Sequence, residues 1–220
     1  MSAIKAIVFD FDGVLADSEP LHLRSYQEVL SPLGVTLTRD QYYADYLGYD
    51  DEGVFRNLAA ARGFELDAPR LEWLIAEKGR VYDTIIASGD VLYPGAVACV
   101  AQMASAFPLG IASGALRHEI EAVLRGARMD RHFRFIVASG ETAESKPAPD
   151  PYRRAAELHG HAPKECLAIE DSRWGIESAR AAGLRCIAIT HTYPADQLSH
   201  ADRVVESLAQ FTPALVQSVG

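Results

Sequence analysis

Short apolar runs separated by helical patterns recur along most of the chain. The first run, 4–9, is rich in β-branched residues and ends in an acidic tight turn. Further apolar runs that predict strands lie at 109–112, 135–138, 166–169, 185–189 and 203–205. Helical patterns between them lie at 96–106, 116–125, 150–159 and 175–182. This alternation predicts a Rossmann-like α/β core, in which helices cover both faces of a parallel sheet.

The stretch between the first two predicted strands has a different pattern. From residue 18 to about residue 86, apolar positions recur with helical spacing and no segment predicts a strand. So long a helical stretch is too long for a simple crossover between neighbouring strands. The pattern therefore predicts an all-α cap domain at 17–87, inserted into a discontinuous core made of 1–16 and 88–220. Hinges are expected near 16–17 and 87–89.

Composition and charge limit the kinds of molecule that the chain is expected to bind. The chain has 220 residues and a formal net charge of −9, which gives no general attraction to nucleic acid or to anionic membranes. No apolar run approaches the roughly 20 residues that span a bilayer. Three scattered cysteines without Cys-x-x-Cys spacing predict reduced thiols and a cytoplasmic location. A monomer is the expected state.

Polar residues gather where the predicted strands end, and ligands bind beyond those ends in parallel α/β sheets. They comprise four carboxylates, a hydroxyl and a lysine: Asp10, Asp12, Ser113, Lys146, Glu170 and Asp171. Two carboxylates 4 Å apart repel by on the order of 4 kcal/mol at an effective dielectric of 20, so a cation must offset them. Hard oxygen ligands favour Mg²⁺, and no His/Cys cluster suggests zinc.

These motifs resemble those of the haloacid dehalogenase superfamily. In chain order they are Asp10-Phe11-Asp12-Gly13-Val14-Leu15, Ser113, Lys146-Pro147 and Glu170-Asp171-Ser172. The helical insertion after the first motif matches as well, and the resemblance covers essentially the whole chain. The segments 17–22, 146–150, 175–176 and 181–183 further resemble the branch that contains β-phosphoglucomutase.

The resemblance implies a role for each motif residue. Asp10 would be the nucleophile that becomes an aspartyl phosphate. Asp12 would be the general acid that protonates the leaving oxygen, and then the base that activates water or an alcohol. Ser113 and the amide of Gly114, expected at the start of a helix, would hold the phosphoryl oxygens.

Charge compensation and metal binding follow from the same resemblance. Lys146 would neutralise charge on the phosphate and on Asp10. Asp10, the main-chain oxygen of Asp12, and Asp171 would bind Mg²⁺, with Glu170 as a further ligand, direct or through water.

Three reactions are implied by the family, and the sequence separates them in part. Dehalogenases lack the second aspartate, so Asp12 argues against that activity. Sugar phosphomutases carry basic residues in the cap, whereas the matching stretch here, 47–52, contains Asp50 and Asp51. This favours hydrolysis of a small phosphorylated metabolite, with a β-phosphoglucomutase-like mutase as the first alternative and an inactive ligand-binding homologue as the second. His22, which matches a histidine of the mutase branch, joins Asp50 and Asp51 as candidate substrate-binding residues.

Overall fold

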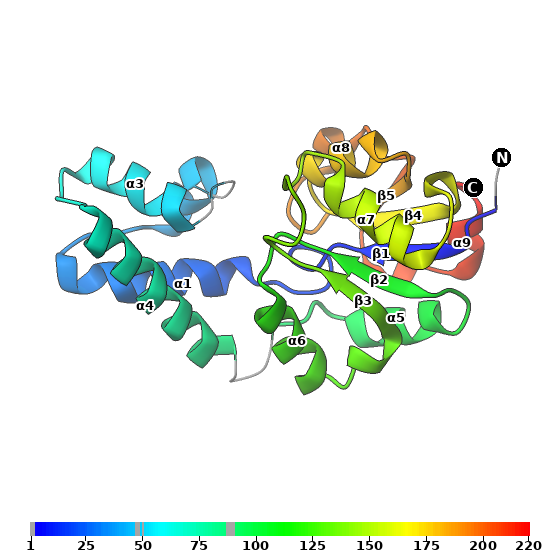
Figure 1. The fold of residues 1–220 in the computed structure, drawn as a ribbon, viewed down its shortest axis with the longest axis horizontal. Helices are drawn as coiled ribbons and strands as arrows, with labels where there is room; N and C mark the ends of the chain where they lie inside the picture. Colours follow the sequence, from blue (N-terminus) through cyan, green and yellow to red (C-terminus); the bar gives the residue numbers. More distant parts are fainter. Residues whose placement is uncertain (1–2, 47–48, 50, 87–90) are drawn as a thin grey trace. The chain divides into compact units, whose positions relative to one another are not determined.

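The chain forms two compact units, each with its own core. The computed structural model describes residues 3–46, 49, 51–86 and 91–220. The larger unit consists of Met1–Asp17 and Val91–Gly220, and the smaller of Ser18–Asp90 (Figure 1). These limits lie close to the expected domain boundaries, although the hinge expected at 87–89 falls outside the described residues.

A six-stranded parallel sheet lies at the centre of the larger unit, in the order β3-β2-β1-β4-β5-β6. The strands are β1 (Ala6–Phe9), β2 (Leu109–Ala112), β3 (Phe133–Val137), β4 (Cys166–Glu170), β5 (Arg185–Ile189) and β6 (Arg203–Val205). The expected Rossmann-like α/β core is confirmed. Strand β3 begins earlier than expected because it is an edge strand, and its exposed Arg134 interrupts the apolar run.

Helices pack on both faces of this sheet. They are α5 (Ala96–Ala104), α6 (Arg117–Gly126), α7 (Asp150–His159), α8 (Arg173–Ala181) and the short α9 (Pro213–Gln217). Helices α7 and α8 cover one face, and α5 lies on the other (Figure 1). All four residues of β1 are buried, as expected of a central strand covered on both faces. The strand therefore holds the residue that follows it, Asp10, at a rigid place in the core.

The smaller unit is built from helices around a core of its own. Its helices are α1 (Glu19–Leu30), α2 (Arg39–Gln41), α3 (Asp51–Arg62) and α4 (Ala68–Ile86). Helix α1 packs along α4, and Leu30, Leu58 and Leu74 are fully buried between the helices. No strand occurs among the described residues of this unit, as the helical spacing predicts.

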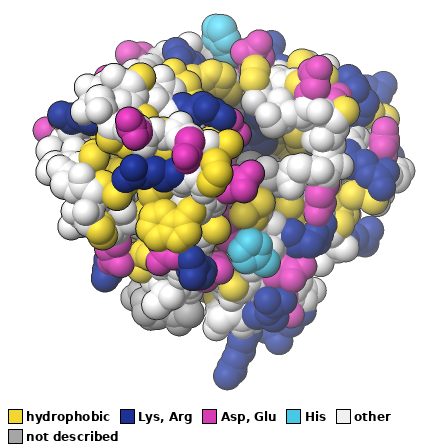
Figure 2. Space-filling view, turned by 60° about the vertical axis from the view of Figure 1, so that its left-hand side comes forward, with side chains coloured by type: hydrophobic (Ala, Val, Ile, Leu, Met, Phe, Trp, Pro, Cys, Tyr) yellow, Lys and Arg dark blue, Asp and Glu magenta, His cyan; other side chains and the backbone are white. Residues whose placement is uncertain are grey.

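The surface carries charges of both signs. Acidic and basic side chains are interspersed with hydrophobic ones on the face drawn in Figure 2. Along the described residues, no helix is long and apolar enough to cross a membrane.

Candidate active site

Strand β1 delivers Asp10 to the carboxyl edge of the sheet. The backbone N–H of Asp10 continues the ladder by donating to the carbonyl of Ile169 in β4, at 2.9 Å. The residue is 8% exposed, and Oδ1 accepts a hydrogen bond from the backbone N–H of Phe11 at 2.7 Å. Asp10 is therefore held by the next residue in the chain and by the adjacent strand, which gives its carboxylate a defined position.

Lys146 joins two of the acidic residues. Its Nζ lies 3.1 Å from Oδ2 of Asp10 and 2.6 Å from Oε1 of Glu170. The Lys146–Pro147 peptide bond is cis. The structure thus brings the lysine of the third motif onto the aspartate of the first, across 136 residues of sequence (146 minus 10).

Glu170 is the anchor of this cluster. Its side chain is fully buried, and Oε1 also accepts from the hydroxyl of Tyr152 at 2.7 Å. Oε2 accepts from the backbone N–H of Asp171 and from the hydroxyl of Ser172, each at 3.2 Å. Both oxygens of Glu170 are therefore occupied by protein donors. This favours a role in holding Lys146 over direct ligation of the metal, which is one of the two ways of binding that the resemblance implies.

Two more residues complete this anchor: Tyr152, which lies outside the sequence motifs, and Gly175, which lies in the stretch 175–176 that resembles the β-phosphoglucomutase branch. Tyr152 lies on α7, where a buried tyrosine resembles any core aromatic. Gly175 lies in the first turn of α8, where a Cβ would meet the carboxyl group of Glu170 at 1.9 Å. Helix α8 begins at Arg173, two residues before the expected start, because Ser172 caps it by accepting from the N–H of Gly175 at 3.1 Å.

Asp171 lies directly against the turn that follows β1. Carboxylate oxygens of Asp10, Glu170 and Asp171 all lie within 4.8 Å of one another. A Cβ on Gly13 would stand 1.9 Å from Oδ2 of Asp171, and Gly13 has a φ of +75°. Only glycine fits there, because it alone has no Cβ and adopts this conformation at low cost.

The cluster is strongly acidic and largely buried from solvent. Burial raises the pKa of Asp10 to about 8, with Glu170 and Asp12 adding to the shift and Lys146 opposing it. Burial likewise raises the pKa of Asp171 well above its usual value, and Glu170 and Asp10 add to that shift. Burial alone would lower the pKa of Lys146, but Asp10 and Glu170 beside it raise the pKa overall.

The donor set fits a divalent cation. With all groups ionised, three carboxylates and one lysine sum to −2. A buried, all-oxygen set of this charge suits a hard cation such as Mg²⁺. Binding such a cation would favour the ionised form of Asp10.

Asp12, Ser113 and Gly114 lie at the same edge of the sheet. Asp12 is half-buried in the turn after β1, and its charge acts on Asp10. Ser113 is 4% exposed at the end of β2, and its hydroxyl accepts from the N–H of Ala115 at 3.1 Å. Helix α6 begins only at Arg117, so the expectation that Ser113 and Gly114 open a helix is wrong. Gly114 lies in an exposed loop, which offers amides without the contribution of a helix terminus.

Comparison with known proteins agrees with the order and geometry of these motifs. Residues 4–183 match the family described as haloacid dehalogenase-like hydrolase. The chain belongs to the haloacid dehalogenase-like hydrolases.

Several relatives of this hydrolase match along nearly their whole length. Protein CbbY of Rhodobacter capsulatus is 35% identical over 225 residues, which cover 96% of this chain and 97% of that protein. The phosphoglycolate phosphatase of Yersinia pestis is 28% identical over 222 residues, covering 97% and 94%. A crystal structure of CbbY from Rhodobacter sphaeroides in complex with xylulose-(1,5)bisphosphate has a TM-score of 0.81 at 28% identity, covering 94% and 96%.

The helical unit of the hydrolase contains a polar cluster around Lys78. This lysine is 3% exposed, and its Nζ lies 2.8 Å from Oδ1 of Asp51 and 2.8 Å from Nδ1 of His22. The hydroxyl of Tyr26 donates to Asp51 at 2.5 Å, and His22 stacks on Tyr82 with ring centroids 4.3 Å apart. Burial and the charge of Lys78 hold the pKa of His22 well below its usual value, so its Nδ1 accepts from the lysine.

This cluster changes the argument drawn from the acidic stretch 47–52. Asp51 is neutralised within its own unit by Lys78, a basic residue that the local sequence does not connect with it. The acidic stretch therefore does not by itself exclude a second phosphate. Asp50 lies outside the described residues. Substrate binding by His22, Asp50 and Asp51 stays a prediction.

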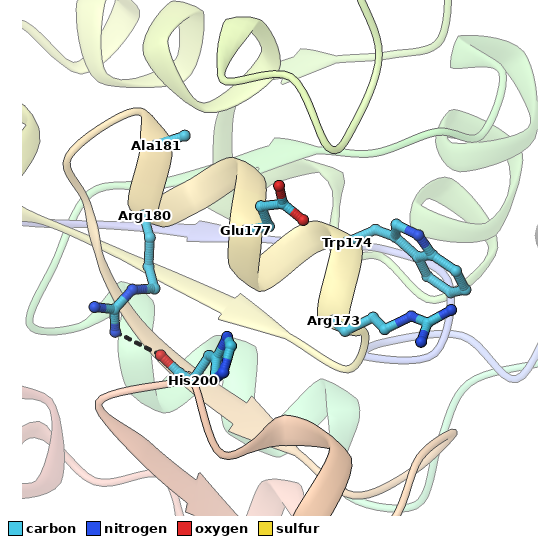
Figure 3. Close-up of a pocket in the computed structure, with 6 residues that line it drawn as sticks. All are labelled: Arg173, Trp174, Glu177, Arg180, Ala181 and His200. Atoms are coloured by element: carbon cyan, nitrogen blue, oxygen red, sulfur yellow. Dashed lines mark hydrogen bonds between the residues drawn. The ribbon is translucent and has the colours of Figure 1, made fainter.

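A separate hollow lies on the surface along α8. It measures about 790 Å³ and is lined by Arg173, Trp174, Glu177, Arg180, Ala181 and His200. Figure 3 shows Arg173 and Trp174 at one end of the helix and Arg180 at the other, where it donates to the carbonyl of His200 at 2.5 Å. None of the motif carboxylates lines this hollow, so it is distinct from the candidate active site.

Proposed function

We propose that this hydrolase cleaves the phosphate ester of a small sugar phosphate or related metabolite through an aspartyl phosphate on Asp10. The observation that carries the proposal is the contact of Lys146 with both Asp10 and Glu170, beside Asp171. A structural ion pair needs one carboxylate, whereas this lysine lies among three. That excess of buried acid is what a site for a metal ion and a phosphate requires.

The first half of the reaction uses Asp10 and Asp12. An oxygen of Asp10 bonds to phosphorus while the bond from phosphorus to the ester oxygen breaks. Asp12 gives its proton to that oxygen, which leaves as an alcohol. Lys146, and phosphoryl contacts from Ser113 and the Gly114 amide, compensate the charge on the transferring group.

The second half restores the enzyme. Water attacks phosphorus, Asp12 takes the proton of that water, and the bond between phosphorus and Asp10 breaks, releasing inorganic phosphate. Asp10, the main-chain oxygen of Asp12, and Asp171 would hold Mg²⁺, which would supply positive charge to the phosphate oxygens. Glu170 supports this arrangement by fixing Lys146.

The substrate class rests on the relatives. One of them is named a phosphoglycolate phosphatase, and another has been crystallised with xylulose-(1,5)bisphosphate. We infer a small phosphorylated metabolite, with water as the acceptor. A mutase is the alternative; Lys78 of the helical unit is paired with Asp51, so its charge would serve a second phosphate only if that pair opened. We also propose a cytoplasmic location, which agrees with three free buried cysteines, Cys99, Cys166 and Cys186. We further propose that the protein is a monomer.

A panel of phosphate monoesters tests the proposed function. Phosphate release is measured for sugar phosphates, phosphoglycolate and p-nitrophenyl phosphate, with Mg²⁺ and with chelator. We expect metal-dependent turnover that is lost in Asp10→Asn. A wild-type protein that releases no phosphate from any member, and converts no β-glucose 1-phosphate when primed with bisphosphate, would contradict an enzymatic role. Conversion of β-glucose 1-phosphate without phosphate release would instead establish the mutase.

A further inference from the structure

His191 reaches the catalytic turn from a distant part of the chain. It lies in the loop after β5, 178 residues from Gly13 in sequence, and its Nδ1 lies 3.0 Å from the carbonyl oxygen of Gly13. Because the carbonyl can only accept, Nδ1 carries the proton and donates. Gly13 directly follows Asp12, the residue to which proton transfer is assigned.

The face of the His191 ring is held in place by Tyr93. The two rings are stacked, with centroids 3.8 Å apart and planes inclined by 25°. Tyr93 is tied to the same turn, since its N–H donates to the carbonyl of Leu15 at 2.9 Å. Its hydroxyl donates to Oδ1 of Asp17 at 3.3 Å. The imidazole therefore has a defined orientation, which a free surface histidine lacks.

The turn itself needs external support. Gly13 has a φ of +75° and no side chain, so its own conformation is weakly limited. Its N–H donates to the carbonyl of Ala16 at 2.8 Å, while Asp171 and Thr192 close the space where a Cβ would project. The hydrogen bond from His191 adds the contact that fixes the Gly13 carbonyl, and with it the rotation of the backbone next to Asp12.

We propose that His191 is a positioning residue for Asp12, one that holds the 12–13 turn so that the Asp12 carboxyl group meets the leaving oxygen. The inference rests on the proposed phosphatase reaction. General acid catalysis contributes about 10²- to 10⁴-fold, and a misplacement of about 1 Å can cost about 100-fold. Loss of the support should therefore affect proton transfer more than the attack by Asp10.

Two substrates separate these steps. p-Nitrophenyl phosphate has a leaving group that departs without being protonated, whereas the alkoxide of β-glycerophosphate must be protonated. The quantity compared is kcat/KM, which covers steps up to transfer of the phosphoryl group to Asp10. In His191→Leu we expect a loss of about tenfold or more for β-glycerophosphate and of less than about threefold for p-nitrophenyl phosphate.

A conservative variant and a matched control complete the test. His191→Asn keeps an N–H donor near the position of Nδ1 and should recover most of the lost kcat/KM. His200→Leu removes an exposed imidazole from the same β5–β6 connection and should change neither substrate. If His191→Leu fails to fold, Tyr93→Ala removes the stacking partner and should show the same asymmetry.

The outcomes separate this inference from the proposed function. A wild-type protein inactive on these two substrates and on every other member of the phosphate monoester panel, without mutase conversion, would end the proposed function itself. An active wild-type protein whose His191→Leu variant loses activity equally on both substrates, or on neither, would overturn only the role of His191. Failure of His191→Asn to recover activity, at a melting temperature equal to that of wild type, would do the same.

Discussion

Because Gly13 has no Cβ, the carboxylate of Asp171 can occupy the space beside it. A Cβ there would overlap Oδ2 of Asp171 at 1.9 Å, and the positive φ adds strain. We predict that Gly13→Ala lowers kcat by at least about 100-fold, since displaced catalytic groups lose their alignment. Steady-state kinetics on p-nitrophenyl phosphate measures this.

The control for Gly13 is a glycine of similar conformation with open space around it. Gly160, at the end of α7, has a φ of +70°, and a Cβ added there would meet nothing within 4 Å. Gly160→Ala should cost about 1–2 kcal/mol of stability from the left-handed conformation and leave kcat unchanged. A similar loss of kcat in both variants would show that backbone strain, and not overlap with Asp171, is responsible.

A second residue couples stability to pH. His159 of α7 is 6% exposed, its Nε2 lies 3.3 Å from the carbonyl oxygen of Ile7, and its Nδ1 has no partner among the described residues. Burial lowers its pKa to about 4, so the folded protein holds this imidazole neutral. An unfolded chain protonates it near pH 6.5. The stabilising contribution is therefore complete above about pH 6.5 and is lost as pH falls toward 4.

This linkage predicts a loss of about 2 kcal/mol between pH 7.5 and pH 5 from His159 alone. Urea unfolding at the two pH values measures it. The variant His159→Gln should be less sensitive to pH by that amount, whatever its absolute stability. Exposed His200 serves as the control, because His200→Gln should keep the wild-type pH dependence. An unchanged pH dependence in His159→Gln would contradict the assignment.

At the scale of elements, the ion pair between Asp51 of α3 and Lys78 of α4 joins two helices of the smaller unit. Lys78 is 3% exposed on its side chain, and Asp51 is 31% exposed. Removing Asp51 leaves a buried ammonium without its carboxylate, which costs several kcal/mol in fully buried pairs. We predict that Asp51→Ala lowers the free energy of unfolding by about 2–3 kcal/mol, and that adding Lys78→Met recovers much of it.

The neighbouring residue supplies the control for this pair. Glu52 pairs with Arg56 at 2.7 Å, but both side chains are more than half exposed. Glu52→Ala should cost less than about 0.5 kcal/mol in the same urea titration. Equal losses in the two variants would contradict the distinction. Because Asp51→Ala would destabilise the helical unit, a kinetic test of substrate binding by Asp51 should use Asp51→Asn. The asparagine keeps an oxygen that can accept from Tyr26 and Lys78.

Sequence patterns predict well those elements whose buried face produces a clear run or spacing of apolar residues. Strands β2, β5 and β6 and helix α7 have the expected limits because their apolar or amphipathic runs end at clear turns. The segment 38–46 has no such signal, since it forms one α-helical turn after a Thr38 capping box and then a π-helical turn at Tyr42–Tyr46. The tyrosines of this segment pack into the core, but their spacing does not follow the 3.6-residue period of an α-helix.

The site is predictable where motifs lie at strand ends, and less so where contacts depend on distant segments. Asp10, Lys146 and Asp171 gather because parallel strands end at one edge of the sheet. Tyr152, Lys78 and His191 make contacts that no local spacing reveals. The helix expected at 116–125 forms at Arg117–Gly126, but Ser113 and Gly114 lie in the loop before it, because a polar Ser-Gly pair forms loops as well as helix caps.

At the scale of the whole molecule, the net charge of −9 acts in opposite ways on the two expected ligands, the phosphate ester and the metal ion. A negative chain repels phosphate esters at long range, whereas it attracts divalent cations. Metal binding should therefore precede productive substrate binding. A cation that binds the folded larger unit, and not the unfolded chain, must also stabilise the protein.

That linkage predicts a rise in the melting temperature when Mg²⁺ binds. At a free Mg²⁺ concentration about 100 times Kd, the stabilisation is about 2.7 kcal/mol, which raises Tm by about 5–10 °C for a chain of this size. Asp171→Asn removes one ligand and one charge, so the Mg²⁺-dependent rise should largely vanish. Asp196→Asn, which makes the same charge change at an exposed position, should keep it. Thermal melts with Mg²⁺ and with chelator, at fixed ionic strength, distinguish specific binding from screening. If Asp196→Asn lost the rise as fully as Asp171→Asn, stabilisation would come from the general negative field and not from the Asp10–Asp171 site. If only Asp171→Asn lost it, cation affinity would depend on the carboxylates that β1 and β4 bring together.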